Sequence, residues 1–320
     1  MSNEAITIKL DELAGNIKRL DLSAEVAASE SEREYFRHYG IDFEDRFPGL
    51  KHHFGCIDCA SYSIAAHYYD IKEAEGTCFI VHGYYDHSGL YGRIIEYCLK
   101  RKLSVVVYDL PGHGLSSGEQ STIPSFSDYQ AVLSDVVDWF SSVAPKPWNA
   151  IGQSTGGAIL MDFLLSAREP LFAKTVLLAP LVRPVSWPRT KLLHRMAGVF
   201  FNKIPRRFAK NSHDNNFLEF LKTNDPLQSR YLPLTWVTAL KQWINYFEHL
   251  RFVEYAPLII QGKEDKTVDW KYNIPAIQKK FPNSKLYYVN EGRHHLSNED
   301  ELILTKLYAA MDIYFDVFKD

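Results

Sequence analysis

The chain has 320 residues, with 36 Lys and Arg against 39 Asp and Glu, so its formal net charge is −3 at neutral pH. This balance argues against general nucleic-acid binding, which requires a basic surplus. A hydrophobic content of 46% and a charged content of 23% are ordinary for a globular protein. Length and composition together allow one large α/β domain with an insertion, or two smaller domains.

The N-terminus has no basic region followed by an apolar run and a cleavage site, and no stretch approaches the ~18 apolar residues of a membrane span. We therefore expect no signal peptide, no transmembrane helix and a cytoplasmic location. Of the four cysteines, Cys56 and Cys59 form a lone Cys-x-x-Cys, while Cys78 and Cys98 stand apart. No second pair completes a zinc site, so we interpret this spacing as chance.

Residues 1–52 have the pattern of a helical N-terminal extension. A first set of apolar residues recurs at helical spacing: Ile6, Leu10, Leu13, Ile17 and Leu20. A second helix is expected after Ser29, because Glu32 follows three residues later as in a capping box. The extension could be a regulatory or docking arm, but we favour simple packing against the body.

Beyond residue 53, segments typical of strands alternate with segments typical of helices. The expected strands cover residues 62–69, 77–81, 104–108, 175–178, 257–261 and 285–289, together with the apolar run that ends before Ser154. The expected helices cover residues 90–100, 274–280 and 299–318, with others following Ser125 and Ser154. This alternation predicts an α/β fold whose mostly parallel sheet is covered by helices on both faces.

The alternation stops between residues 183 and 250, where aromatic and helical patterns replace strand patterns. We interpret this stretch as a helical cap inserted over the C-terminal edge of the sheet, where α/β folds bind ligands. The predicted body of the protein then comprises residues 53–182 and 251–320.

Ser154 is the centre of a Gly-x-Ser-x-Gly sequence that lies between a predicted strand and a predicted helix. A sharp strand-to-helix turn requires neighbours almost without side chains, and Gly152 and Gly156 meet that need. Such a turn exposes the serine hydroxyl at the end of the sheet, with the backbone N–H of Thr155 beside it. A glycine-rich loop with a chance serine is the alternative, and the strand and helix around it argue against that.

A serine hydroxyl needs a base to take up its proton, and candidates follow later in the chain. His294 and His295 come after the last predicted strand, and Asp265 comes directly after the preceding one. The order Ser, Asp, His is that of one known triad arrangement, with all three residues at the C-terminal ends of strands. Glu264 or Asp269 could replace Asp265 in this scheme.

His82, Gly83 and Tyr84 follow the strand expected beside the Ser154 strand. A backbone N–H here, best placed on Tyr84, would complete an oxyanion hole with that of Thr155. We expect the side chain of His82 to be hydrogen-bonded locally and His113 to be structural.

These motifs together resemble α/β-hydrolases of the monoacylglycerol lipase and lysophospholipase group, which includes serine aminopeptidase-like hydrolases. The resemblance spans residues 77–300 and is carried by the following segments: His82-Gly83-Tyr84, His87-Ser88-Gly89, the loop from Asp109 to Gly118, Gly152-Gln153-Ser154-Thr155-Gly156-Gly157, Gly262 with Asp265, and Arg293-His294-His295-Leu296 with Asn298-Glu299. It implies an α/β-hydrolase fold, and it selects Asp265 as the acid and His294, which directly follows an Arg, as the base. The group often has a small residue where Tyr84 stands, so the pocket entrance is expected to differ.

The cap contains a basic segment of its own. Eight Lys or Arg and no Asp or Glu occur from residue 183 to residue 210, interleaved with large apolar side chains. Such a segment could touch an anionic membrane surface transiently or attract substrates with an anionic head group. We favour the simpler interpretation, a charged face on a cap that packs over the pocket. The cap aromatics expected near the substrate are Trp187, Phe200, Trp236 and Trp243.

The sequence therefore predicts a serine hydrolase of carboxylic esters, with monoacyl lipids such as lysophospholipids or monoacylglycerols as substrates. The alternatives are a carboxylesterase or thioesterase for small substrates and a non-catalytic ligand-binding protein on the same fold. A metal hydrolase is disfavoured because the His82, Asp86 and His87 group lacks a further histidine, and the glycine spacing after Asp109 does not fit dinucleotide binding. We expect no cofactor and no metal, and the sequence does not indicate an oligomeric state.

Overall fold

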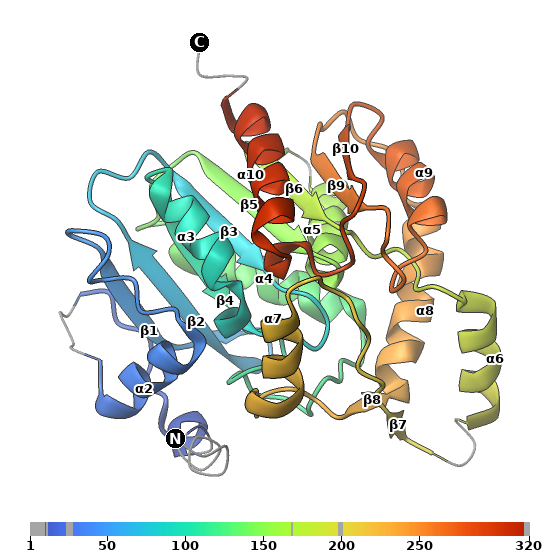
Figure 1. The fold of residues 1–320 in the computed structure, drawn as a ribbon, viewed down its shortest axis with the longest axis horizontal. Coiled ribbons are helices and arrows are strands. Elements are labelled where there is room, and N and C mark those ends of the chain that lie inside the picture. Colours follow the sequence, from blue (N-terminus) through green and yellow to red (C-terminus); the bar gives the residue numbers. More distant parts are fainter. Residues whose placement is uncertain (1–9, 11, 24–27, 168, 198–200, 317–320) are drawn as a thin grey trace.

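A mostly parallel eight-stranded sheet forms the centre of the molecule (Figure 1). The structure is a computed structural model that describes residues 10, 12–23, 28–167, 169–197 and 201–316. The strand order is β1-β2-β4-β3-β5-β6-β9-β10; β2 is antiparallel to β1 and β4, and the later pairs are parallel. The strands are β1 (Lys51–Cys59), β2 (Tyr62–Asp70), β3 (Thr77–Val81), β4 (Ser104–Tyr108), β5 (Trp148–Gln153), β6 (Lys174–Leu178), β9 (Leu258–Gly262) and β10 (Lys285–Val289).

Both faces of the sheet are buried at its central strands β3, β4 and β5, because alternate side chains of a strand enter two different apolar cores. In β3, Phe79 and Val81 face one core, whereas Cys78 and Ile80 face the other. Helices α4, α5, α8 and α9 contribute to the first core, and α2, α3 and α10 to the second. Their bounds are α2 (Glu30–Tyr39), α3 (Gly92–Lys100), α4 (Phe126–Phe140), α5 (Thr155–Ser166), α8 (Leu234–His249), α9 (Trp270–Lys280) and α10 (Glu301–Asp316). The predicted α/β fold class is confirmed.

Strand β1 was not predicted from the sequence. It is the first strand of the sheet and pairs along its length with β2, while on its other side Cys56 exchanges backbone hydrogen bonds with Lys18 and Leu20 of the extension, at 2.8 and 2.9 Å. Polar residues such as Lys51, His52 and Asp58 interrupt its apolar pattern, which a position at the rim of the sheet permits. His52 nevertheless stacks on Tyr69 of β2, with ring centroids 4.1 Å apart.

The N-terminal extension packs against the body. Helix α2 begins with the expected capping box: the Ser29 hydroxyl accepts from the Glu32 N–H at 3.3 Å, and the Glu32 carboxylate accepts from the Ser29 N–H at 2.6 Å. Tyr35 and Phe36 of this helix are buried in the second core. Of the earlier apolar set, Leu10, Leu13 and Leu20 are buried, while Ile6 lies outside the described residues.

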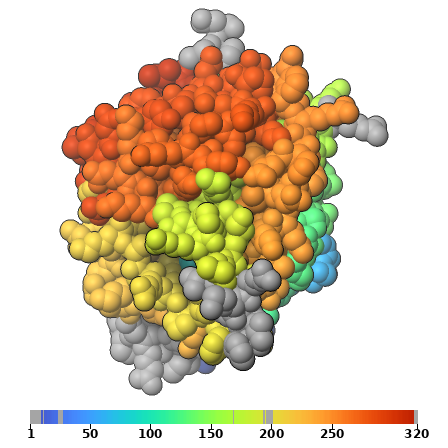
Figure 2. Space-filling model, turned by 90° about the vertical axis from the view of Figure 1, so that its right-hand side faces the viewer, coloured from blue at the N-terminus to red at the C-terminus, as the bar shows by residue number. Residues whose placement is uncertain are grey.

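The segment between β6 and β9, here called the inserted segment (residues 183–250), carries more than helices. Besides α8 it contains α6 (Trp187–Ala197), α7 (Asn215–Glu219) and an antiparallel pair of three-residue strands, β7 (Lys203–Pro205) and β8 (Tyr231–Pro233). A three-residue strand is too short to show an alternation of apolar and polar residues in the sequence. The insertion was therefore expected to be purely helical, and these two strands were not predicted. Figure 2 shows the face where α6, in yellow-green, lies between the C-terminal part of the body and the rest of the inserted segment. None of the helices that the structure describes is long and apolar enough to cross a bilayer.

Candidate active site

Ser154 lies on a strained turn between β5 and α5. Its φ of 54° and ψ of −110° fall outside the common regions for a residue with a side chain. The backbone around it is fixed, because the Ser154 N–H donates to the Leu178 carbonyl at 2.9 Å and the Ser154 carbonyl accepts from Leu181 N–H at 3.0 Å. The hydroxyl is therefore held in one position at the C-terminal end of the sheet.

The two glycines of the motif are required by close backbone contacts. A Cβ on Gly156 would lie 2.0 Å from the Val81 carbonyl oxygen of β3, and a Cβ on Gly152 would lie 2.6 Å from the Gly156 carbonyl oxygen. Both distances are far below van der Waals contact. Any larger residue would push α5 off the sheet and displace Ser154, which is the steric role that the sequence predicted.

His294 and Asp265 complete a hydrogen-bonded chain with the serine. The Ser154 Oγ lies 3.0 Å from His294 Nε2, and His294 Nδ1 lies 2.8 Å from Asp265 Oδ2. All three residues are buried, with 6–7% of their surface exposed. The structure thus brings together, in the predicted order and at hydrogen-bond distance, three residues far apart in the chain.

The Asp265 carboxylate is held by further donors. Its Oδ1 accepts from the backbone N–H groups of Thr267 at 2.7 Å and Val268 at 3.1 Å, and its Oδ2 also accepts from Gln261 Nε2 at 3.2 Å. Burial by itself would raise the pKa of Asp265, but the charge and hydrogen bond of His294 and the two backbone donors lower it below its ordinary value. The carboxylate is therefore ionised at neutral pH.

The pKa of His294 shifts in the opposite direction to that of Asp265. Burial alone would lower its pKa, but the attraction and hydrogen bond of Asp265 raise it above 6.5. An imidazole in this setting accepts a proton from Ser154 more readily than a free one, because the resulting cation is stabilised by the adjacent carboxylate.

The alternative residues are engaged elsewhere. The Asp269 carboxylate accepts from Arg183 Nη2 at 2.9 Å, and Glu264 is about half exposed, at 3.5 Å from His213. His295 points away from the serine, and its Nε2 lies 3.1 Å from Asp86 Oδ1. Geometry therefore singles out the same three residues as the family resemblance.

Two supporting residues, Gln153 and Glu299, belong to the segments that carry the resemblance, but the sequence assigned neither of them a role. Gln153, which directly precedes the serine, donates from Nε2 to the His294 carbonyl at 2.9 Å and so ties β5 to the histidine loop. Glu299 is fully buried and accepts from the N–H groups of Arg293 and His213, both at 2.6 Å. The resemblance marked the position of Glu299 but not its role, because burial of this side chain depends on contacts with segments distant in the chain.

The loop after β3 lies beside the serine and is rigidly supported. The Tyr91 hydroxyl accepts from the Gly83 N–H at 2.9 Å and donates to Asp86 Oδ2 at 3.0 Å. His82 lies 2.8 Å from the Gly83 carbonyl and accepts from the Leu110 N–H at 2.8 Å, which is the local bonding expected of it. The ring of His113 likewise bonds locally, at 2.9 Å from the carbonyl of Pro111.

Tyr84 and Thr155 carry the N–H groups expected to form the oxyanion hole. Thr155 is the first residue of α5, so its N–H has no acceptor within the helix. In the part of the chain that the structure describes, neither N–H donates to a protein acceptor. The Tyr84 ring stacks on Trp236 of α8, with centroids 3.8 Å apart, so this tyrosine also joins the body to the inserted segment.

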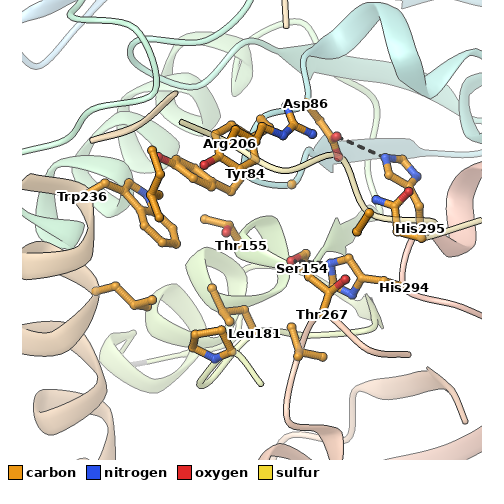
Figure 3. A pocket seen from close by; sticks show the side chains of 18 of the residues that line it. Tyr84, Asp86, Ser154, Thr155, Leu181, Arg206, Trp236, Thr267, His294 and His295 are labelled. Carbon is orange, nitrogen blue, oxygen red and sulfur yellow. Dashed lines mark hydrogen bonds and ion pairs between the residues drawn. The ribbon is translucent and has the colours of Figure 1, made fainter. Parts of the chain in front are cut away.

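A cavity of about 260 Å³ opens at Ser154 (Figure 3). Its walls come from both the body and the inserted segment. The polar lining includes Asp86, Ser154, Thr155, Arg206, Arg207, Thr267, His294 and His295, and the apolar lining includes Leu181, Trp187, Leu221, Leu232, Trp236, Val237, Leu240 and Val268. The cavity is therefore a mainly apolar chamber with polar groups gathered near the serine, which suits an ester with a hydrocarbon chain.

The aromatic residues expected near the substrate separate into three groups. Trp187 and Trp236 line the cavity. Trp243 does not: its Nε1 donates to Asp162 at 3.0 Å and its ring stacks on Phe126, so it fastens α8 to the body. Phe200 lies outside the described residues. Within the described ranges, no group of three or more His, Cys, Asp or Glu is arranged to hold a metal ion.

The fold and this strand–turn–helix serine define an α/β-hydrolase. A family model described as serine aminopeptidase, S33, matches residues 72–301, and the chain belongs to that family, within its monoglyceride lipase-like group.

Named relatives agree with this assignment. The monoglyceride lipase homolog of Monkeypox virus is 32% identical over 79% of this chain and 94% of its own length. Human monoglyceride lipase is 28% identical over 69% of this chain and 76% of its own length. Among solved structures, a soluble variant of the Saccharomyces cerevisiae monoglyceride lipase in complex with a substrate analog superposes with a TM-score of 0.72 at 14% identity, over 86% of this chain and 98% of that chain.

Proposed function

We propose that this hydrolase cleaves the carboxylic ester of monoacyl lipids, monoacylglycerols or lysophospholipids, with Ser154 as nucleophile, His294 as general base and Asp265 as the residue that orients it. The observation that carries the proposal is the continuous Ser154–His294–Asp265 hydrogen-bond chain at the floor of an apolar cavity. The monoglyceride lipase names of two relatives support the lipid ester as substrate.

The reaction follows from the positions of these groups. Ser154 Oγ attacks the ester carbonyl while His294 Nε2 takes its proton, and the N–H groups of Tyr84 and Thr155 donate to the developing oxyanion. His294 then gives the proton to the departing alcohol, which leaves an acyl-enzyme ester on Ser154. A water molecule, deprotonated by His294, attacks this ester and releases the fatty acid, which regenerates the serine.

Two reagents test the proposal together. A fluorophosphonate should label the wild type but not Ser154→Ala, and the variant should lose on the order of 10⁶ in kcat when the triad acts as a unit. The wild type should also hydrolyse monoacyl lipids in a panel of esters. Esterase activity of wild-type size in Ser154→Ala would contradict the nucleophile, and an unlabelled wild type would favour a ligand-binding protein instead.

The competing activity is hydrolysis of small esters or thioesters with the same triad. The apolar lining of the cavity favours long acyl chains, because each methylene group that it buries contributes about 0.8 kcal/mol to the binding free energy. A lipid hydrolase should therefore show kcat/KM rising with acyl length, whereas a small-ester enzyme should not.

We also propose that the inserted segment acts as a cap that meets a lipid surface transiently. Leu192 of α6 and Phe201 are 59% and 61% exposed, and the exposed Arg189 and Lys191 lie nearby in the sequence. Exposed apolar and basic side chains together favour an anionic bilayer. Flotation with phosphatidylserine-containing vesicles, compared with purely phosphatidylcholine vesicles, should enrich the wild type over a Leu192→Asp, Phe201→Asp variant. Equal flotation of both would contradict this contact.

A further inference from the structure

The basic residues of the inserted segment occupy different environments. Arg183 is paired with Asp269 at 2.9 Å, and Lys203 lies over the ring of Tyr231 at 4.6 Å. Arg206 and Arg207, by contrast, line the cavity that contains Ser154. The cluster seen in the sequence therefore includes a pair of cations placed where a substrate would bind.

Arg206 is held in a fixed orientation. Its guanidinium carbon lies 3.9 Å from the centroid of the Tyr85 ring and 4.5 Å from that of Phe208. Its Nη1 donates to Gln228 Oε1 at 2.7 Å and to the Ser229 carbonyl at 3.2 Å. A guanidinium fixed in this way loses little further freedom when it binds a ligand.

The charge of Arg206 has no ion-pair partner. Among the described residues, no carboxylate oxygen lies within 4.0 Å of its nitrogens, and only Nη1 donates to the protein. Asp86 is the nearby carboxylate in Figure 3, but its oxygens already accept from Tyr91 and bond to His295. Burial lowers the pKa of Arg206, and the more distant charges of Asp86 and Asp225 offset this effect only in part. The N–H groups of Nε and Nη2 therefore remain available to donate hydrogen bonds to a ligand.

The position of Arg206 relates it to the head group and not to the acyl chain. Figure 3 shows Arg206 beside Tyr84 and Asp86, across the cavity from Leu181. Leu181 belongs to the apolar lining, so we place the hydrocarbon chain against the Leu181 wall and the alcohol part of the ester toward Asp86 and Arg206.

We infer that Arg206 forms a phosphate subsite, so that the preferred substrates are monoacyl glycerolipids whose head group carries a phosphate. This inference rests on the proposed lipid ester hydrolysis. A guanidinium is the side chain best matched to a phosphate, because it presents parallel N–H donors to two oxygens, and Arg207 adds a second positive charge at the same cavity.

The test compares two lipids of the same acyl chain, 1-acylglycerol and 1-acylglycerol 3-phosphate, as monomers at low salt. The wild type should show a kcat/KM at least about tenfold higher for the phosphate lipid. In Arg206→Gln the ratio of the two constants should fall about 10- to 100-fold, the range expected for lost hydrogen bonds to a charged group. Arg206→Lys should keep part of the preference, since it retains the charge without the fork. Because both lipids are measured on one preparation, the ratio does not depend on how much of a variant is folded.

Arg251→Gln is the matched control, because Arg251 is an exposed arginine directly after the inserted segment that does not line the cavity. It should keep the wild-type ratio. An unchanged ratio in Arg206→Gln, an equal fall in Arg251→Gln, or no preference in the wild type would each overturn the inference.

Free phosphate is distinguished from the lipid head group in a second arm. Glycerol 3-phosphate and inorganic phosphate should inhibit hydrolysis of the neutral lipid competitively in the wild type and more weakly in Arg206→Gln. Inhibition by phosphate without any preference for the phosphate lipid overturns the inference, because it indicates a free-anion site. Hydrolysis of neither lipid overturns the proposed function and this inference with it, whereas equal kcat/KM for both overturns this inference alone.

Discussion

Replacing Asp265 by Asn probes the orientation of the general base without changing the shape of the site. In the structure Asp265 accepts on both oxygens: from His294 and Gln261 on Oδ2, and from two backbone N–H groups on Oδ1. An amide has one accepting end only. If its oxygen stays with the backbone donors, its NH₂ group faces His294 Nδ1, which must then accept. The ring proton is then on Nε2, which faces Ser154. A protonated Nε2 cannot accept the serine proton, so the histidine no longer acts as a base.

The size of the effect follows from this geometry. A base locked in the wrong tautomer should cost roughly 10⁴ in kcat, or about 5.4 kcal/mol at about 1.36 kcal/mol per factor of ten. Binding of the ester should change little, because Asp265 does not line the cavity. We therefore expect kcat to fall while KM stays close to the wild-type value.

The pH profile gives an independent readout. His294 must be neutral to act as base, and its pKa is raised above 6.5 chiefly by the attraction and hydrogen bond of Asp265, which outweigh burial. Wild-type kcat/KM should therefore decline as the pH falls through a value above 6.5. In Asp265→Asn the attraction is absent, so the remaining activity should decline at a lower pH.

The assay is stopped-flow or plate hydrolysis of a soluble p-nitrophenyl ester, with active sites counted by fluorophosphonate titration. Glu264→Gln is the matched control, because it removes the neighbouring, half-exposed carboxylate, and it should retain activity and the wild-type pH profile. A loss of less than tenfold in Asp265→Asn, or an equal loss in Glu264→Gln, would refute the assignment of Asp265.

Three other outcomes are expected. His294→Ala should abolish turnover, whereas His295→Gln should keep most of it; the reverse result would exchange the roles of the two histidines. For monoacylglycerols of increasing chain length, kcat/KM should climb until the cavity is full, and a flat profile would argue against lipid substrates. Tyr39→Phe should lower the free energy of unfolding in urea by about 1.5–3 kcal/mol, because the Tyr39 hydroxyl donates to the buried Asp225 carboxylate at 2.8 Å. Tyr246→Phe, at an exposed tyrosine of α8, should change it little, and equal shifts in the two variants would contradict the Tyr39 contact.

The sequence by itself determined the fold class and the location of the candidate serine. Buried parallel strands are short apolar runs separated by helical patterns, so β3, β4 and β5 can be predicted from the local sequence alone. The role of the glycines around Ser154 can also be predicted locally, because the turn requires the residues two positions before and after the serine to have no side chain. Chain order and position after a strand also indicated Asp265 and a histidine near residue 294.

Tertiary structure decided what depends on contacts between distant segments. Local spacing left Glu264 and Asp269 as alternatives to Asp265, and only the folded chain shows which carboxylate bonds to His294. Trp243 carried the same aromatic signal as Trp236, yet it fastens α8 to the body while Trp236 lines the cavity.

The basic segment makes the same point about charge. In the sequence its arginines are equivalent, because composition records a charge but not its surroundings. Folding pairs Arg183 with a carboxylate and leaves Arg206 stacked between two rings, without an ion-pair partner, in the wall of the cavity. The energy of a charge depends on its solvation and its neighbours, and both are fixed only when the inserted segment folds over the body.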